Sequence, residues 1–243
     1  MALLNNRVAL VTGGSRGIGR AVAISLADAG AAIAVNYREK AAEARTVVEA
    51  IRKAGGRAMA IAADVSRATD VADMMSAVEG ELGPVDVLVN NAGIGLVRTV
   101  DDLTEEDFDR TIAVNLKSAF LCTQAVIPGM RARKWGRIVN ISSGAARGAG
   151  GVGPHYNASK AGMEGMTRGY AARLVKDGIT VNAVAPSLIE TDMVRSGLAS
   201  SAARIPLGRF GTPEECAQAV LMVIGNAYMT GQTVALSGGL SFV

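Results

Sequence analysis

A tyrosine and a lysine stand four residues apart in a helical stretch, as Tyr156 and Lys160. Positions i and i+4 share one face of a helix. An ammonium group a few ångströms from a phenol favours the phenolate and lowers the tyrosine pKa from its usual value of about 10. Such a pair suits a general acid and base that works near neutral pH. Taken alone, this spacing more often reflects a tyrosine packed against a lysine stem on an exposed helix.

A glycine-rich turn lies between an apolar run and a helical stretch near the N-terminus. Backbone N–H groups and the positive end of a helix attract an anion in this setting, and glycines let the backbone approach a pyrophosphate. The spacing Gly-x-x-x-Gly-x-Gly differs from the usual Gly-x-Gly-x-x-Gly, so an ordinary turn is the alternative. The strand-turn-helix context favours a dinucleotide site at Gly13, Ser15, Arg16, Gly17, Ile18 and Gly19.

The next apolar run ends in Asn36-Tyr37-Arg38. An NAD-preferring site usually has an acidic residue there for the ribose 2′-hydroxyl, and neither Asn36 nor Tyr37 is acidic. The guanidinium groups of Arg16 and Arg38 suit a 2′-phosphate instead. We therefore predict NADP(H) as the cofactor, against the alternative that Arg38 only begins a solvated helix.

Several motifs, in order along the chain, resemble those of the short-chain dehydrogenase/reductase family. The resemblance covers essentially the whole chain. The motifs are Thr12-Gly13-x-x-x-Gly17-Ile18-Gly19, Asp64-Val65, Asn90-Asn91-Ala92-Gly93, Val114-Asn115-Leu116, Ser143 at the family's usual separation from Tyr156, Tyr156-x-x-x-Lys160, and Pro186 with Ile189-Glu190-Thr191-Asp192-Met193.

This resemblance implies four catalytic residues. Tyr156 would protonate the carbonyl oxygen during reduction, while Lys160 lowers the tyrosine pKa and holds the nicotinamide ribose. Ser143 would hydrogen-bond the substrate oxygen and stabilise the charge that develops there, with Ser142 as the alternative for this role. Asn115 would anchor a water that relays protons to Lys160.

The resemblance also implies cofactor contacts beyond the glycine-rich turn. Asp64 and Val65 would meet the adenine, and the segment after Pro186 would cover the nicotinamide. The full set adds Tyr37, Arg38, Asp64, Val65, Asn91, Ala92, Gly93, Tyr156, Lys160, Pro186, Ile189 and Thr191.

Within the family, the chain is most similar to 3-oxoacyl-[acyl-carrier-protein] reductases, through residues 15–19, 36–38, 178–182, 189–193 and 231–233. It departs from them at four places. Ser187 replaces a usual Gly, Ser237 replaces a usual Asn, residues 193–205 form a shorter stretch, and Asp177 stands where some of these reductases carry a basic residue that meets the carrier protein. These departures leave the chemistry untouched and bear on the carrier of the substrate.

We predict NADPH-dependent reduction of a ketone, foremost a 3-oxoacyl thioester, to the hydroxy compound. One alternative is a reductase or dehydrogenase of small ketones, secondary alcohols or diols, because residues 144–153 carry few bulky side chains. A non-catalytic nucleotide-binding protein of the same fold is another, but it has no need of Asn115, Ser143, Tyr156 and Lys160 together. His155 either faces the substrate or only begins a helix.

Short apolar runs alternate with helical patterns along the chain, which favours a doubly wound, mostly parallel sheet of about seven strands. We predict one Rossmann-type α/β domain over residues 1–243, with a substrate lid near 187–206. The predicted strands are 7–12, 32–36, 58–63, 85–90, 137–142, 180–185 and 233–236. The predicted helices are 17–29, 41–54, 71–82, 105–131, 154–176 and 213–224.

Composition narrows the classes of partner. The 243 residues carry a net charge of +3, and 49% of them are hydrophobic, so disorder is not expected. The basic residues are scattered, without the stripe that nucleic acid requires. One cluster of basic residues comprises Arg131, Arg133, Lys134 and Arg137. This cluster is typical of a solvated helix end. We expect its first three residues close to the end of a helix near the active-site mouth, where they could instead attract an acidic carrier protein.

Two cysteines and a single histidine support neither a disulfide framework nor a zinc cluster, and we predict no metal site. The sequence has no signal-peptide core and no apolar run of membrane-spanning length, so we expect a cytoplasmic protein. Small and apolar residues in the two longest helical stretches predict a homo-oligomer, and the resemblance favours a tetramer. These residues include Ala119, Ala125, Ala161, Gly162, Gly165 and Met166.

Overall fold

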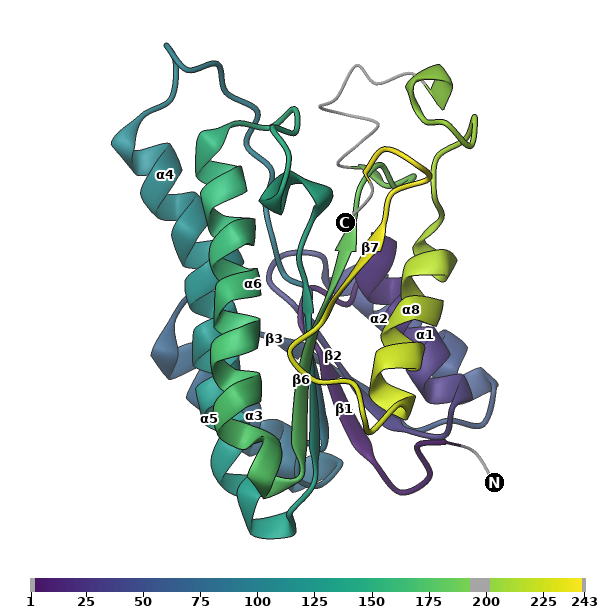
Figure 1. The fold of residues 1–243 in the computed structure, drawn as a ribbon. Helices are drawn as coiled ribbons and strands as arrows, with labels where there is room; N and C mark the ends of the chain where they lie inside the picture. Colours follow the sequence, from purple (N-terminus) through teal and green to yellow (C-terminus); the bar gives the residue numbers. More distant parts are fainter. Residues whose placement is uncertain (1–2, 193–201, 242–243) are drawn as a thin grey trace.

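Seven apolar segments form the strands of one parallel sheet in the computed structural model, which describes residues 3–192 and 202–241 (Figure 1). The strands are rich in Val, Ile and Ala and lack polar alternation because helices cover both faces of the sheet. They are β1 (Val8–Val11), β2 (Ala32–Tyr37), β3 (Ala58–Ala62), β4 (Val87–Asn90), β5 (Gly136–Ile141), β6 (Ile179–Pro186) and β7 (Thr233–Leu236). All seven predicted strands are confirmed, within two residues at each end.

The helices form a layer on each face of the sheet (Figure 1). One layer holds α1 (Gly17–Asp28), α2 (Ala41–Lys53) and α8 (Pro213–Gly225). The other holds α3 (Ala68–Glu81), α4 (Glu105–Ile112), α5 (Ser118–Arg133) and α6 (Pro154–Leu174). This three-layer arrangement confirms the predicted doubly wound α/β fold. None of the helices in the described part of the chain is long and apolar enough to cross a membrane.

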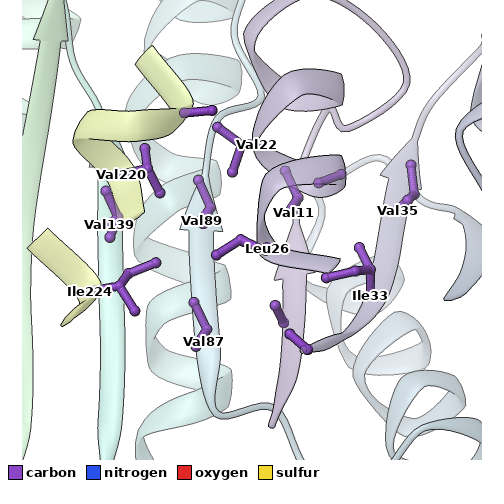
Figure 2. Close-up of a cluster of buried hydrophobic side chains, with 14 of the residues drawn as sticks. Val11, Val22, Leu26, Ile33, Val35, Val87, Val89, Val139, Val220 and Ile224 are labelled. Carbon is purple, nitrogen blue, oxygen red and sulfur yellow. The ribbon is translucent and has the colours of Figure 1, made fainter. Parts of the chain in front are cut away.

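The buried core anchors the central strands. Figure 2 shows strand residues such as Val11 and Val89 facing Val22 and Leu26 of α1 and Val220 of α8. Full burial of each aliphatic side chain contributes about 1.5–3 kcal/mol. The carboxyl ends of β1, β4 and β5 are therefore held rigidly, and the loops that follow them inherit fixed positions.

The strand order β3-β2-β1-β4-β5-β6-β7 reverses direction at β1. The chain runs outward through β2 and β3 and then returns to β4 on the other side of β1. The loops after β1 and β4 therefore lead to helices on opposite faces of the sheet, and a crevice lies between them. Ligands bind in this crevice in sheets of this kind.

The predicted helix over 105–131 is wrong in its continuity. A π-helical turn, Ala113–Lys117, divides it into α4 and α5. A π turn carries one extra residue and realigns the side chains that follow it, and it occurs frequently at functional sites. Apolar periodicity cannot reveal this insertion, because the pattern resumes on the far side. The turn carries Asn115.

The predicted lid near 187–206 is described only in part, because residues 193–201 lie outside the described residues. Met193 and most of the short stretch noted in the sequence fall there. On one side, Ser187 N donates to the Leu236 carbonyl (2.9 Å), and Ile189 forms a β-bridge with Gly211. On the other, a short 3₁₀ turn over Ala202–Arg204 precedes the buried Ile205.

Candidate active site

A cleft of about 540 Å³ opens at the carboxyl ends of the strands. Every residue predicted to contact the cofactor lines it, from the glycine-rich turn to the segment after β6. The predicted catalytic residues Ser143, Tyr156 and Lys160 line it as well, whereas Asn115 lies behind its wall. The fold therefore brings together residues that are up to 178 positions apart, between Gly13 and Thr191.

The glycine-rich turn is built for close approach of a ligand to the backbone. Gly13 and Gly17 have positive φ angles of 60° and 52°, which favour glycine. A Cβ on Gly19 would overlap the Gly13 carbonyl oxygen and the Asn91 side-chain amide. Helix α1 begins here without a side-chain cap and without an acidic residue in its first turn. Its N–H groups and positive dipole end thus suit the pyrophosphate of a dinucleotide.

Side-chain hydrogen bonds hold the loops after β1 and β4 together. Thr12 Oγ1 accepts from the backbone N–H groups of Asn91 and Ala92, both at 3.0 Å. Asn91 Nδ2 in turn donates to the carbonyls of Thr12 (2.9 Å) and Gly13 (3.0 Å). The side chains of Asn91 and Thr12 therefore hold the glycine-rich turn against the loop after β4.

Asn36 has a role that the sequence reasoning missed. Its Oδ1 accepts from Gly13 N (3.2 Å), and its Nδ2 donates to the Ala63 carbonyl (3.2 Å). It thereby joins the ends of β1, β2 and β3. From the sequence, we considered Asn36 only because it is not acidic. Its amide can both donate and accept a hydrogen bond, and this is the signal that could have indicated such a bridge.

The two arginines predicted to hold a 2′-phosphate both face this end of the cleft, and each is paired with a carboxylate. Arg38 Nη2 lies 2.6 Å from Glu39 Oε1, and Arg16 Nη1 lies 3.2 Å from Asp192 Oδ2. Both pairs are largely exposed. Exposed ion pairs contribute only about 0–1 kcal/mol, so an incoming phosphate could replace either carboxylate at small cost.

Asp64 follows β3 at the place predicted for the adenine. Its Oδ1 accepts from Ser66 N (3.0 Å) and Ser66 Oγ (2.6 Å). Although burial acts to raise it, these hydrogen bonds lower the pKa of Asp64 below its ordinary value. The carboxylate is therefore fixed and charged at neutral pH.

Tyr156 and Lys160 project from α6 into the cleft, beside Ser143 at the end of β5. The Ser143 side chain interacts with the Tyr156 phenol as a hydrogen-bond partner that acts to lower its pKa. Lys160 is almost fully buried; its Nζ donates to the Ile141 carbonyl (2.8 Å) and lies 5.8 Å from the centre of the Tyr156 ring. The hydroxyl, the phenol and the ammonium thus converge on one wall of the cleft.

The predicted lowering of the Tyr156 pKa by Lys160 is contradicted in this structure. Burial raises the pKa of Tyr156 above its ordinary value, and the hydrogen bond with Ser143 acts in the opposite direction. Burial also lowers the pKa of Lys160 to about 8. Helical spacing placed the two residues on one face, but it could not show that burial would raise the pKa of the phenol and lower that of the ammonium.

Asn115 is completely buried in the π turn, where its amide clamps the loop after β4. Oδ1 accepts from Ile94 N (2.8 Å), and Nδ2 donates to the Ile94 carbonyl (3.0 Å) and to Ser159 Oγ (3.1 Å). Ser159 directly precedes Lys160 on α6. Asn115 therefore links the loop that lines the cleft to the helix that carries Tyr156 and Lys160.

Two alternatives left open by the sequence are separated by geometry. The Ser142 hydroxyl points away from Tyr156, toward the Lys160 carbonyl and Glu164 Oε1, both at 3.3 Å. Ser143 is the serine that meets Tyr156. His155 is buried and does not line the cleft; its Nε2 lies 2.9 Å from the Leu96 carbonyl, so it anchors that loop to the start of α6.

The family assignment rests on more than the local geometry. The sequence pattern of the short chain dehydrogenase family matches residues 7–201. The chain belongs to this family. Its fold and its cleft agree with that membership, which makes the protein an oxidoreductase that acts on the CH–OH or C=O group of its substrate with a nicotinamide cofactor.

Relatives of this short-chain dehydrogenase span nearly its whole length. A 3-oxoacyl-[acyl-carrier-protein] reductase from Synechocystis sp. is 41% identical over 244 residues, covering 99% of each chain. A (2S)-[(R)-hydroxy(phenyl)methyl]succinyl-CoA dehydrogenase subunit from Thauera aromatica is 40% identical, covering 98% of each chain. A crystal structure of a candidate gluconate dehydrogenase from Agrobacterium tumefaciens superposes with a TM-score of 0.93 at 33% identity, covering 99% of this chain and 98% of that one.

The basic cluster of this short-chain dehydrogenase does not lie near the cleft, and that part of the prediction is wrong. Arg131 and Lys134 sit at the C-terminal end of α5, immediately before β5 begins, at the amino ends of the strands and the bottom of Figure 1. Arg131 Nε pairs with Asp177 Oδ2 (2.8 Å), and Lys134 Nζ lies 3.5 Å from Asp177 Oδ1. Arg133 pairs with Asp86 (3.1 Å). The sequence showed the charges but not which edge of the sheet they occupy.

The remaining polar and sulfur-bearing groups of the described residues form no second centre. Cys122 and Cys216 are buried as free thiols, and burial raises the pKa of each to about 12. Within residues 3–192 and 202–241, no group of three His, Cys, Asp or Glu side chains could hold a metal ion.

Proposed function

We propose that this short-chain dehydrogenase reduces a 3-oxoacyl thioester to the 3-hydroxyacyl thioester with NADPH. The observation that carries the proposal is the convergence of Ser143, Tyr156 and Lys160 on one wall of a cleft whose other end suits a dinucleotide. Two kinds of relative support the substrate class, because the names of both enzymes describe an acyl thioester that bears an oxo or hydroxyl group.

The chain's own residues would position and protonate the ketone. The Ser143 hydroxyl and the Tyr156 phenol donate hydrogen bonds to the carbonyl oxygen and stabilise the negative charge that grows there. The cofactor, when bound, supplies the hydride to the carbonyl carbon. Tyr156 then gives its proton to the oxygen. Its raised pKa keeps the phenol protonated at neutral pH, as an acid in the reductive direction must be.

Lys160 and Asn115 would assist the proton transfer by Tyr156 without contacting the ketone. Lys160 lies on the same face of α6 as Tyr156, where it would hold the nicotinamide ribose and bring a positive charge to the developing phenolate. Asn115 keeps the loop after β4 and α6 in register through Ile94 and Ser159. A water held there would return a proton toward Lys160.

The cofactor contacts follow from the same cleft. The open start of α1 would bind the pyrophosphate, and Asp64 with Val65 would meet the adenine. Arg16 and Arg38 would exchange their carboxylate partners for the 2′-phosphate, which selects NADP over NAD. The segment 187–206 would form a lid over the nicotinamide and the substrate within the single domain 1–243.

A second candidate is the reduction or oxidation of small ketones, alcohols or diols. Ser187 lines the cleft, and its Oγ occupies the space that a Cβ on Gly144 would need. This hydroxyl, at a position where related reductases usually have glycine, would offer a hydrogen bond to a polar substrate. The likeness to a candidate gluconate dehydrogenase points the same way.

An NADPH-oxidation assay separates these functions. Acetoacetyl-coenzyme A, a simple β-keto ester and a small unactivated ketone are compared by kcat/KM, each with NADPH and with NADH. The proposal expects the thioester to be the best substrate and NADPH the better cofactor. Turnover of the unactivated ketone alone would favour the second candidate, and no turnover of any of them would mean that the natural substrate is an unrelated ketone or alcohol.

A further inference from the structure

A buried carboxylate beside the active site is not used by the mechanism above. Glu164 lies one helical turn beyond Lys160 on α6 and is 4% exposed. Its Oε1 accepts from Ser142 Oγ (3.3 Å), and its Oε2 pairs with Arg147 Nε (3.0 Å). Both oxygens of one carboxylate therefore hold the chain segment that contains Ser143.

Ser142 and Arg147 bracket Ser143 on its two sides. A short 3₁₀ turn, Gly144–Ala146, lies between them. Ser143 caps the start of this turn, because its Oγ accepts a hydrogen bond from Ala145 N (3.2 Å). The place of the Ser143 hydroxyl is thus determined by the path of this turn. The ion pair fixes the far end of the turn to the helix that carries Tyr156.

Apart from this ion pair, the segment is also held just beyond the turn, where Asn157 Nδ2 of α6 donates to the carbonyls of Gly148 (2.8 Å) and Ala149 (2.7 Å). Arg147 is the only side chain larger than a methyl group from Gly144 to Gly151, which read Gly-Ala-Ala-Arg-Gly-Ala-Gly-Gly. Such a segment buries little apolar surface, and segments with few buried contacts open at low free-energy cost. The side chain of Arg147 keeps 35% of its surface exposed while that of Glu164 keeps 5%, so the arginine reaches inward to the carboxylate.

A buried ion pair contributes little net stability, because desolvation of the charges offsets their attraction. It does fix geometry, since a carboxylate shielded from water has no solvent to replace a displaced partner. The position of this pair, rather than its contribution to stability, is what relates it to the reaction.

We propose that Glu164 and Arg147 are positioning residues that hold the Ser143 hydroxyl in place against the Tyr156 phenol. This inference rests on the proposed function, because it assigns a purpose to the Ser143–Tyr156 geometry. It adds two residues to the reductase site, neither of which touches substrate or cofactor.

The test uses Glu164→Gln and Arg147→Met, with Arg131→Met as a matched control. Arg131 also pairs through Nε with a carboxylate (2.8 Å), but at the opposite edge of the sheet. We expect kcat for the best ketone substrate to fall by about 10- to 100-fold in each test variant, since small misplacements of reacting groups have effects of this size. The Kd for NADPH, measured by fluorescence, should stay within about twofold. Arg131→Met should match the wild type in both.

A double-mutant cycle distinguishes positioning from general damage. In a Ser143→Ala background, adding Glu164→Gln should lower kcat by less than about twofold, because residues that act as a unit are not additive. An unchanged kcat in the single variants, or the same fold-loss with and without Ser143, would overturn the inference. If a single variant fails to fold, Arg147→Met combined with Glu164→Leu leaves no unpaired buried charge and should still show the loss. Wild-type activity of Ser143→Ala itself would instead overturn the proposed function.

Discussion

At the scale of single residues, burial shifts the pKa values of the two groups that define this site. Tyr156 and Lys160 share a helix face, yet burial acts on both in the direction that favours their neutral forms. For the phenol this is an advantage in reduction, because the acid must keep its proton until the substrate oxygen takes it. For the lysine it sets an upper limit to the working pH.

We expect that limit to appear in the pH profile. Lys160 has a pKa lowered from 10.5 to about 8, so its ammonium is present below that pH and lost above it. Reductive kcat/KM should be steady below about pH 7 and fall by up to about tenfold per unit above pH 8, if the charge is needed. In Lys160→Arg, which keeps its proton, activity should be lower but the step near pH 8 should vanish. A wild-type profile flat to pH 10 would contradict this.

We expect single residues to set the choice of cofactor as well. Replacing Arg38 with Asp should raise the Kd for NADPH by about 10- to 100-fold, since hydrogen bonds to charged groups contribute about 1.5–3 kcal/mol. NADH should become the relatively better cofactor. Arg45→Asp, exposed on α2 and away from the cleft, is the control. A wild-type enzyme that uses NADH more efficiently would show that the arginines do not serve a phosphate.

At the scale of elements, sequence pattern predicted what periodicity and turn chemistry determine. Each apolar run became a strand, and the glycine-rich turn opened α1 as expected. The residues predicted to line the cleft could be found because parallel strands all deliver their following loops to one edge of the sheet. Residue types such as Tyr156 and Lys160 then identified the chemistry expected at that edge.

The features that pattern could not predict depend on contacts between distant segments. The π turn at Asn115 is invisible to helical periodicity, and the Asn36 bridge requires three strand ends to meet. In the sequence, Glu164 is indistinguishable from any other polar residue of a helix. Only the fold shows that it is buried against Arg147 and Ser142.

At the scale of the whole molecule, the exposed apolar residues on α4, α5 and α6 favour a homo-oligomer. Ala125 and Ala161 lie exposed on α5 and α6, as do the aromatic rings of Phe108 and Phe120 on α4 and α5, each 43% exposed. Small and apolar residues on adjacent helices suit a symmetric partner. We expect light scattering at micromolar concentration to give four times the 24.9 kDa of one chain. A stable monomer would be inconsistent with this expectation.

The placement of charge on the whole molecule bears on the carrier of the substrate. Arg131 and Lys134 both pair with Asp177 and lie at the edge of the sheet opposite the cleft. We therefore expect only a weak advantage for an acidic carrier protein, within about tenfold in kcat/KM of the same acetoacetyl group on coenzyme A. Comparing the two carriers at low and high salt measures this directly. A large, salt-sensitive preference for the carrier protein would mean that other basic residues guide it.

The most direct test of the central claim is turnover of Tyr156→Phe. This change removes the transferable proton and keeps the ring, so kcat should fall by at least about 10²- to 10⁴-fold, the usual contribution of a general acid or base. NADPH binding, measured by fluorescence, should be largely retained. Tyr170→Phe on the same helix, where the phenol accepts from Gln124 Nε2 (3.0 Å), should behave as the wild type. Near wild-type turnover by Tyr156→Phe would contradict the assignment of this phenol as the proton donor.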